Sequence, residues 1–424
     1  MKRKLIIGER IMYVDALTPV NVVFTAKISG TIDPDILRAA LLKIQKKHPL
    51  LRMSIDDQQK GGPYFLLNEN IREIPVRMVG RESDEDWLTE ARSELDQLFD
   101  GKDEPLARIV WLKSAGVSEL LWVLPHCICD GSTLVALMQE MLLLLDEPDT
   151  ELVPYATFNS VKELLPSSFS ASSAKIFKAR MFSLLGNVFF YFKPSRRKVA
   201  AGNNYFLHWR LNQEETAKLI ELSKAEKTTV HATLCIAFMN AFQQVMGARA
   251  HGKVICPVDI RRFIPEIKND TMFAFAPIVE LDTDMKADID FWTRARTLKT
   301  ELTTKVEALK VEELLWMSEY FHAVANKMIR FLKATDGTHD VTLSNMGKLR
   351  IPETYKSFVV DHICSPTVAF PWRNPNTLVT STFKDQMDFT LQSNDTFMTE
   401  EEAALIKTKA MNLIFDDLKQ LSVA

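Results

Sequence analysis

The region between residues 146 and 204 constrains the fold most, because it divides the sequence into two halves. It contains four prolines and the serine-rich run PSSFSASSA; the prolines are Pro148, Pro154, Pro166 and Pro194. Prolines end helices and interrupt central strands, so this stretch breaks any continuous core. The chain of 424 residues is also long for one core. We therefore expect two domains, at residues 1–165 and 205–424, joined by a linker or crossover at 166–204.

Both halves mix strand patterns with helical patterns. In the first half we expect strands at 20–31, 106–113 and 119–126, and helices from Asp33 to before Pro49, at 84–99 and at 132–145. In the second half we expect a strand near 205–211, a strand at 253–262, strands near 338–345, 356–363 and 377–393, and helices at 213–225, 229–245, 288–309, 312–333 and 399–420. Strands interleaved with helices in this way indicate the α/β class.

Charge and cysteine content exclude several classes of protein. The net charge of −3 provides no basic excess for a nucleic-acid backbone. The basic N-terminus is followed by an apolar run too short for a signal peptide, and no run of 18 apolar residues predicts a membrane-spanning helix. Five scattered cysteines are typical of a reducing compartment. We expect a cytoplasmic protein without nucleic-acid partners.

The run LWVLPHCICDGST, at residues 121–133, is the strongest chemical signal in the first half. It predicts a buried strand that ends at His126, and a histidine is the side chain best able to take up a proton near neutral pH. Asp130 either orients this histidine directly or fixes the loop to a cationic group. Gly131 permits a sharp turn and a close approach to a neighbour.

A metal or a cysteine nucleophile at this motif is disfavoured. Zinc usually takes four ligands in two spaced pairs, and no second pair accompanies His126, Cys127 and Cys129. If the strand continues, both cysteines face away from the histidine. We therefore expect no metal site here and no Cys–His catalytic pair. A core histidine satisfied by the backbone remains the alternative to a catalytic one.

Several segments, taken in order, resemble the HxxxDG acyltransferase superfamily. This superfamily includes chloramphenicol acetyltransferase, condensation domains of nonribosomal peptide synthetases, plant acyltransferases, alcohol acetyltransferases and polyketide-associated acyltransferases. The matching segments are HPLLR (48–52), the motif PHCICDG, TTVHATLCIAFMNAF (228–242), PVDIRR (257–262) and VTLSNMGKL (341–349). The resemblance covers nearly the whole chain. It implies two chloramphenicol-acetyltransferase-like α/β sandwich domains with the active-site tunnel at their interface.

The resemblance also implies roles for individual residues. His126 matches the catalytic histidine, which lies where the two domains meet. Asp130 matches a structural aspartate that pairs with an arginine of the second domain, here Arg261, with Arg262 the less favoured register. Gly131 matches the glycine of the loop.

The late strand offers donors for a developing oxyanion. The candidates are Ser344, which we favour as a catalytic residue, and Thr342 and Asn345. Strand alternation places Thr342 and Ser344 on one face and Asn345 on the other. The alternative is a strand that simply turns at Asn-Met-Gly.

Two departures from the superfamily pattern bear on function. Many relatives carry a second histidine directly before the catalytic one, where this chain has Pro125. That position is not the catalytic one, so the mechanism is unaffected. The Asp-Phe-Gly-Trp-Gly motif of plant relatives is absent from the sequence, which favours a bacterial or fungal branch.

The expected activity is transfer of an acyl group from a thioester to a hydroxyl or amine. Acyl-CoA is the favoured co-substrate, a phosphopantetheine carrier thioester is the next, and no bound cofactor is expected. The partners would be a small-molecule donor and acceptor, with an acyl carrier protein as a further candidate. We expect a monomer. The alternatives are a stand-alone amide-forming condensation enzyme and a catalytically idle homologue that binds a carrier or small molecule.

An apolar stretch with basic flanks lies inside the crossover, at residues 175–198. It predicts a helix that acts as a lid, lies on a membrane surface, or packs on the body of the protein. We favour packing on the body, and therefore expect no membrane association.

Overall fold

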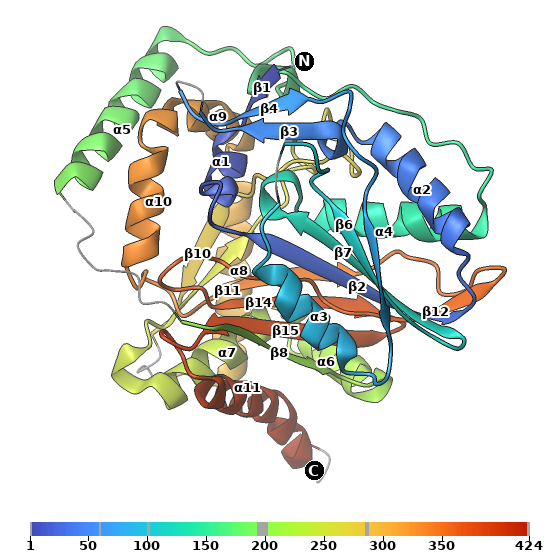
Figure 1. Cartoon of the computed structure of the whole chain (residues 1–424). Coiled ribbons are helices and arrows are strands. Elements are labelled where there is room, and N and C mark those ends of the chain that lie inside the picture. Colours follow the sequence, from blue (N-terminus) through green and yellow to red (C-terminus); the bar gives the residue numbers. More distant parts are fainter. Residues whose placement is uncertain (1, 59–60, 100–101, 193–201, 285–287, 422–424) are drawn as a thin grey trace.

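The computed structural model describes five stretches of the chain, residues 2–58, 61–99, 102–192, 202–284 and 288–421 (Figure 1). Strands and helices mix in both halves, and the described strands form two large sheets and one small sheet. The expected α/β class is therefore confirmed.

The first large sheet comes mainly from the N-terminal half of the chain. Its strand order is β12–β2–β7–β6–β5. The bounds are β2 (Asn21–Gly30), β5 (Val76–Gly80), β6 (Arg108–Ser114), β7 (Val117–Pro125) and β12 (Phe358–Ile363). Neighbours are antiparallel except β5 and β6. The predicted hairpin between β6 and β7 is confirmed, and Gly116 supplies the positive φ that its turn requires.

Two strands of the C-terminal half cross over to complete this sheet. Both β12 and the two-residue β13 (Thr367–Val368) pair antiparallel with β2. The sequence places residues 358–368 in the second domain. In the structure they instead lie beside β2, which belongs to the first domain. A division of the chain at residue 205 would not separate the two sheets.

The second large sheet has the order β10–β9–β11–β14–β15–β8. The bounds are β8 (Asn204–Arg210), β9 (Lys253–Pro257), β10 (Ile278–Asp282), β11 (Val341–Lys348), β14 (Thr377–Phe383) and β15 (Gln386–Asn394). β11 runs parallel to β9 and β14. The prediction of one strand at 377–393 was wrong, because Lys384 and Asp385 adopt positive φ and turn the chain back.

Helices cover both sheets (Figure 1). Their bounds are α1 (Ile7–Tyr13), α2 (Pro34–Lys47), α3 (Asp86–Leu95), α4 (Gly131–Asp146), α5 (Ser173–Phe192), α6 (Gln213–Ala225), α7 (Val230–Met246), α8 (Phe291–Glu307), α9 (Val311–Ser318), α10 (Ala325–Ala334) and α11 (Glu400–Leu421). α2 begins as predicted, since the Asp33 carboxylate accepts from two backbone N–H groups of the first turn. The predicted helix at 312–333 is instead broken by the 3₁₀ segment η5 (Glu319–Ala323).

Three packed regions hold these layers together. α2 and α4 bury leucines against the first sheet, and α7 and α11 bury their apolar faces against the second. A further cluster joins Ile6 near the N-terminus to Ile260, Ile264 and Trp316 of the C-terminal half. The small sheet of β1 (Lys2–Lys4), β4 (Tyr64–Leu67) and β3 (Met53–Asp56) lies beside the first half.

Candidate active site

The strand that leads to the histidine ends one residue before it. β7 stops at Pro125, and residues 126–128 form the one-turn 3₁₀ helix η2 (His126–Ile128). The backbone N–H of His126 donates to the Val20 carbonyl at 2.7 Å, which fixes the turn beside β2. The argument from strand alternation about Cys127 and Cys129 was therefore wrong, because these residues are no longer in a strand. Both thiols are buried, and burial raises their pKa values, so neither is a ready nucleophile.

The backbone sets the tautomer of the half-buried His126 ring. Its Nδ1 lies 2.8 Å from the Cys129 carbonyl oxygen. A carbonyl only accepts hydrogen bonds, so Nδ1 carries the hydrogen and the neutral ring keeps its lone pair on Nε2. Within the described ranges, no protein group hydrogen-bonds to Nε2. Burial lowers the pKa of His126, and the Cys129 carbonyl offsets this in part. The ring is thus neutral at pH 7 and able to accept a proton.

An aromatic ring from the crossover segment lies next to this imidazole. The chain continues from β13 to Phe370, and its ring centroid is 5.6 Å from that of His126 at an interplanar angle of 34°. Phe370 therefore reaches the histidine only because β13 joins the first sheet.

Asp130 points away from His126 and caps α4. One carboxylate oxygen accepts from the backbone N–H and the hydroxyl of Thr133, both at 2.9 Å. The same carboxylate accepts two hydrogen bonds from the Arg261 guanidinium, at 2.5 and 3.1 Å. Of the two alternatives for Asp130, the structure has the strut to a cation. The expected pairing with Arg261 is confirmed, and Arg262 is exposed.

The Arg261 guanidinium is buried and uses all its donor groups. Besides Asp130 it donates to a carboxylate oxygen of Asp259 at 3.2 Å and to the carbonyls of Lys268 and Thr271 at 3.3 and 2.8 Å. Burial alone would lower the pKa of Arg261, but Asp130 and Asp259 raise it above its ordinary value. This charge therefore stays fixed and ties the loop after β9 to the first turn of α4.

Gly131 is the first residue of α4, and its φ is not positive. The expected sharp turn at this residue was therefore wrong. A Cβ atom there would lie 3.4 Å from the end of the Met346 side chain. That distance is ordinary van der Waals contact, so the packing of α4 on β11 does not require a glycine here.

A cavity of about 980 Å³ lies where α4, α7, β9 and β11 meet. Asp130, Gly131 and Ser344 contribute to its wall, whereas His126 and Thr342 do not. Asn345 also lines it, but its side-chain oxygen accepts from the Gly347 N–H at 2.8 Å. Within the part of the chain that the structure describes, the Ser344 hydroxyl has no protein partner. Ser344 is thus the available hydroxyl among the three predicted donors at this cavity.

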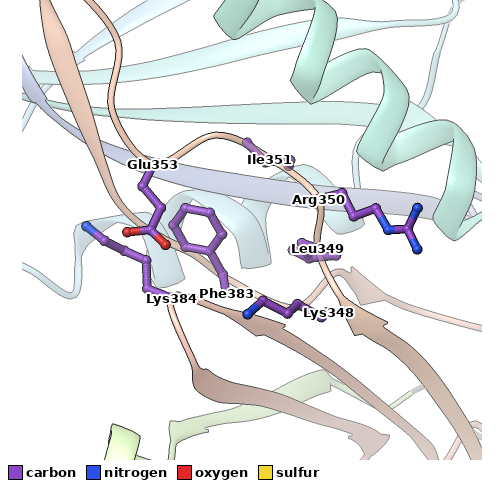
Figure 2. Close-up of a pocket in the computed structure, with 7 residues that line it drawn as sticks. All are labelled: Lys348, Leu349, Arg350, Ile351, Glu353, Phe383 and Lys384. Atoms are coloured by element: carbon purple, nitrogen blue, oxygen red, sulfur yellow. The ribbon is translucent and has the colours of Figure 1, made fainter.

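A second cavity of about 500 Å³ adjoins the first and shares Lys348, Leu349 and Arg350 with it. Figure 2 shows the cationic side chains of Lys348 and Lys384 at this site, with Arg350 directed away from Glu353. Lys348 Nζ is paired with the Asp385 carboxylate at 2.8 Å, and Lys384 Nζ donates to the Val360 carbonyl at 3.1 Å, so Glu353 and Asp385 leave the three cations an excess of one positive charge. That excess favours an anionic group such as a phosphate.

A histidine–cysteine cluster in the larger cavity was not predicted. His231 and Cys235 lie one turn apart on α7, and His231 Nε2 is 3.2 Å from Cys256 Sγ on β9. Hydrogen bonds from Cys235 and from His231 lower the pKa of Cys256, whereas burial raises that of Cys235. The four-residue spacing of His231 and Cys235 on a predicted helix was the available signal.

Among the residues that the structure describes, the same cluster is one of two groups that bring three possible metal ligands together. In each group, His231–Cys235–Cys256 and His208–Cys364–Asp388, the ligand atoms lie within 4.8 Å of one another. Neither group offers the four protein ligands of a structural zinc site.

Comparisons with known proteins agree with this architecture. Residues 204–392 match the family described as phthiocerol/phthiodiolone dimycocerosyl transferase C-terminus. The fold is similar to trichothecene 15-O-acetyltransferase from Fusarium sporotrichioides, with a TM-score of 0.73 and 14% identity over 97% of this chain and 94% of that one. It is also similar to polyketide synthase associated protein 5 from Mycobacterium tuberculosis, with a TM-score of 0.67 and 14% identity over 98% and 97%.

Similarity extends to peptide synthetases. The first condensation domain of the calcium-dependent antibiotic synthetase has a TM-score of 0.69 and 15% identity over 98% of this chain and 96% of that one. In sequence, the chain is 30% identical to tyrocidine synthase 3 of Brevibacillus parabrevis over 122 residues, 28% of this chain and 2% of that protein. It is 28% identical to a probable nonribosomal peptide synthetase of Salinispora arenicola over 226 residues, 49% of this chain and 3% of that protein. The chain thus spans only a few per cent of the length of these curated relatives. The chain therefore has the fold of these acyltransferases and condensation domains, and its C-terminal half, at residues 204–392, matches the transferase C-terminus family.

Proposed function

We propose that this protein is an acyltransferase that moves an acyl group from a thioester to a hydroxyl or amine, with His126 as the general base. The observation that carries the proposal is the state of the imidazole. Nδ1–H is held by the Cys129 carbonyl, and Nε2 is left as a free base in a neutral ring.

In the proposed reaction, Nε2 of His126 takes the proton of the acceptor as its oxygen or nitrogen attacks the thioester carbonyl. The carbon–sulfur bond then breaks, and the imidazolium returns the proton to the leaving thiolate. A thiol with a pKa near ~8.5 is a good leaving group, so no acyl-enzyme is required. The Cys129 carbonyl keeps the ring oriented and stabilises the imidazolium. Such general-base help typically contributes about 10²–10⁴-fold.

The remaining predicted residues have supporting parts in this proposal. Ser344 is the first candidate to donate to the oxyanion, with Thr342 and Asn345 behind it. Asp130 and Arg261 position the loop that follows the histidine, and they do not touch the reacting atoms.

The donor proposed first is acyl-CoA. The cavity lined by Lys348, Arg350 and Lys384 keeps an excess of one positive charge over Glu353 and Asp385, which favours a donor that carries phosphates (Figure 2). A carrier-bound phosphopantetheine also carries a phosphate. The similarity to condensation domains and peptide synthetases therefore favours carrier-dependent amide formation as the second candidate function.

The test is thiol release from acyl-CoA and from acyl-loaded carrier protein, each offered with a panel of alcohols and amines. We expect turnover with acyl-CoA and a loss of about 10²–10⁴-fold in kcat for His126→Ala. His251→Ala, which alters an exposed histidine, is the matched control. Turnover only with loaded carrier would favour the condensation reaction. Equal, background rates for the wild type and His126→Ala with both donors would contradict an enzyme and support an idle binding homologue.

A further inference from the structure

Helix α5 presents its apolar side chains to solvent rather than to the protein. Of its 20 residues, only Ala179 is buried. Phe177, Leu184, Tyr191 and Phe192 are 69, 63, 70 and 75% exposed. Five more large apolar residues of the helix are also exposed: Met181, Phe182, Leu185, Val188 and Phe189. The favoured prediction, a helix packed on the body, is confirmed by the contacts of α5 with α10 and η5, but this packing leaves most of its large apolar side chains outside.

The face of α5 that touches the protein consists largely of small and polar residues. Ala179 is buried, Ser183 donates to the Tyr320 carbonyl at 2.7 Å, and Gly186 lies against Phe321. Asn187 accepts a hydrogen bond from Lys327 of α10, and Phe190 packs on Phe331, with centroids 5.4 Å apart. These contacts recur every three or four residues and define one side of the helix. Most of the exposed apolar residues occupy the opposite side, so the amphipathic pattern is largely inverted. Phe189 and Tyr191 lie at its margin, because Phe189 packs on Phe331, with centroids 6.0 Å apart, and Lys327 lies over the Tyr191 ring.

An apolar surface of this size is not expected to stay in contact with water. Figure 1 shows α5 at the edge of the molecule with α10 beside it, so its outer side is not covered by another described element. No helix of the described residues is long and apolar enough to cross a membrane. The helix can therefore lie on a bilayer but is not suited to span one.

The charges on α5 distinguish between two candidate partners for this surface, a second copy of the chain and a lipid bilayer. Lys175, Lys178 and Arg180 lie on α5, and residues 173–192 contain no acidic side chain. Lys178 and Arg180 are exposed beside the apolar face, and Lys178 Nζ also lies 3.8 Å from a Glu313 carboxylate oxygen. A second copy of the chain would bring the same cations and no carboxylate on the helix to match them. Anionic lipid headgroups match both the cations and the apolar band beneath them.

We propose that the outer face of α5 docks this protein on an anionic lipid surface, with its phenylalanine and leucine side chains inserted among the acyl chains. The helix packs on α10, α10 packs on α1, and α1 packs on η2, which carries His126. The lipid surface would therefore lie three packed elements away from the histidine. The proposal concerns binding alone and holds whether or not the proposed acyl transfer is correct.

The experiment is flotation of the purified protein with vesicles made from equal parts of phosphatidylcholine and phosphatidylglycerol, and with vesicles of phosphatidylcholine alone. The test variant carries Phe177→Ser, Leu184→Ser and Tyr191→Ser together. Its matched control carries Leu17→Ser, Val153→Ser and Leu405→Ser, which remove three exposed apolar side chains elsewhere. Thermal melting checks that both variants remain folded.

We expect the wild type and the control to float with the anionic vesicles, more weakly in high salt. The α5 variant should bind at least about tenfold more weakly. Arg180→Glu should reduce binding without changing the melting temperature.

Absence of wild-type binding to either vesicle, or equal binding by the α5 variant, would overturn the proposal. A wild-type dimer that the α5 variant converts to a monomer, without vesicle binding, would identify a second copy as the occupant. It would overturn the proposal equally.

Discussion

Helices α4 and α5 are both strongly apolar, yet one forms the core and the other the surface. α4 buries nine of its 16 residues against α2 and the first sheet, and α5 buries one of its 20. Both contain long runs of leucine, phenylalanine or methionine. The amount of apolar side chain therefore does not decide which of the two is buried.

The difference lies in where the small and polar residues sit. On α4, Leu134, Leu137, Met138 and Met141 form the inner stripe, and a capping carboxylate and an ion pair fix its first turn. On α5, the inner stripe consists largely of small and polar residues, so apolar side chains are left outside. Close helix contact through small residues thus determines the packed face, and the large residues take the other one.

The largest expected loss of stability follows from removing the ion pair between Arg261 and Asp130, which anchors the start of α4. Arg261→Leu leaves the Asp130 carboxylate without its partner in a largely buried site, which should cost about 3–5 kcal/mol of unfolding free energy. Ser183→Ala, which removes a tie of α5, should cost only about 0.5–1.5 kcal/mol. Denaturant unfolding measures both.

Arg262→Leu is the control for Arg261→Leu, because Arg262 is the next residue in the chain and its side chain is exposed. Similar losses for Arg261→Leu and Ser183→Ala would show that the two helices are anchored equally well and would break the comparison.

A matched pair of leucines tests the buried and exposed faces directly. Leu137→Ala on α4 creates a cavity in the core and should cost about 2–5 kcal/mol. Leu184→Ala on α5 removes the same atoms from an exposed site and should change stability by less than about 0.5 kcal/mol. Urea or guanidinium midpoints measure the difference. Equal costs would mean that the outer face of α5 is covered in the folded protein.

The sequence predicted the elements whose patterns are local. α2, α4 and α7, and the β6–β7 hairpin, follow from helical spacing, caps and a glycine turn. It did not predict that β12 and β13 pair with β2, more than 300 residues earlier, because such pairing depends on the whole fold. The same limit hid the contact of Phe370 with His126.

At the candidate site too, local features could be predicted from the sequence, and contacts between distant segments could not. His126 was evident from its own chemistry, whereas the partnership of Asp130 with Arg261 came from the resemblance. The approach of Cys256 to His231 joins a helix and a strand and has no signal in the sequence order. The inverted orientation of α5 depends on which stripe meets α10, which composition does not reveal.

Two buried cysteines extend the comparison, because their surroundings shift their pKa values in opposite directions. Cys129, beside α4, has its pKa raised by burial, whereas hydrogen bonds from Cys235 and His231 lower that of Cys256 in the cavity wall. At pH 7, iodoacetamide should label Cys256 at least about tenfold faster than Cys129. Peptide mass mapping gives the rates, and His231→Gln should slow the labelling. A Cys256 rate that rises only as the pH approaches ~8.5, as for an ordinary thiol, would contradict the activated pair.

The smallest expected effect is on the titration of His126, just ahead of α4. Burial disfavours the imidazolium, so the pKa lies below the ordinary ~6.5, and the base form persists as the pH falls through that value. Phe370→Ala removes a ring from beside the imidazole and admits water, so the pKa should rise by a fraction of a unit toward ~6.5. NMR of the histidine ring measures this without any substrate, and the acid limb of kcat/KM should move upward with it. An unchanged or lower pKa in Phe370→Ala would show that the crossover segment does not contribute to the burial of His126, and that the turn of η2 and its neighbours alone set the proton affinity of the ring.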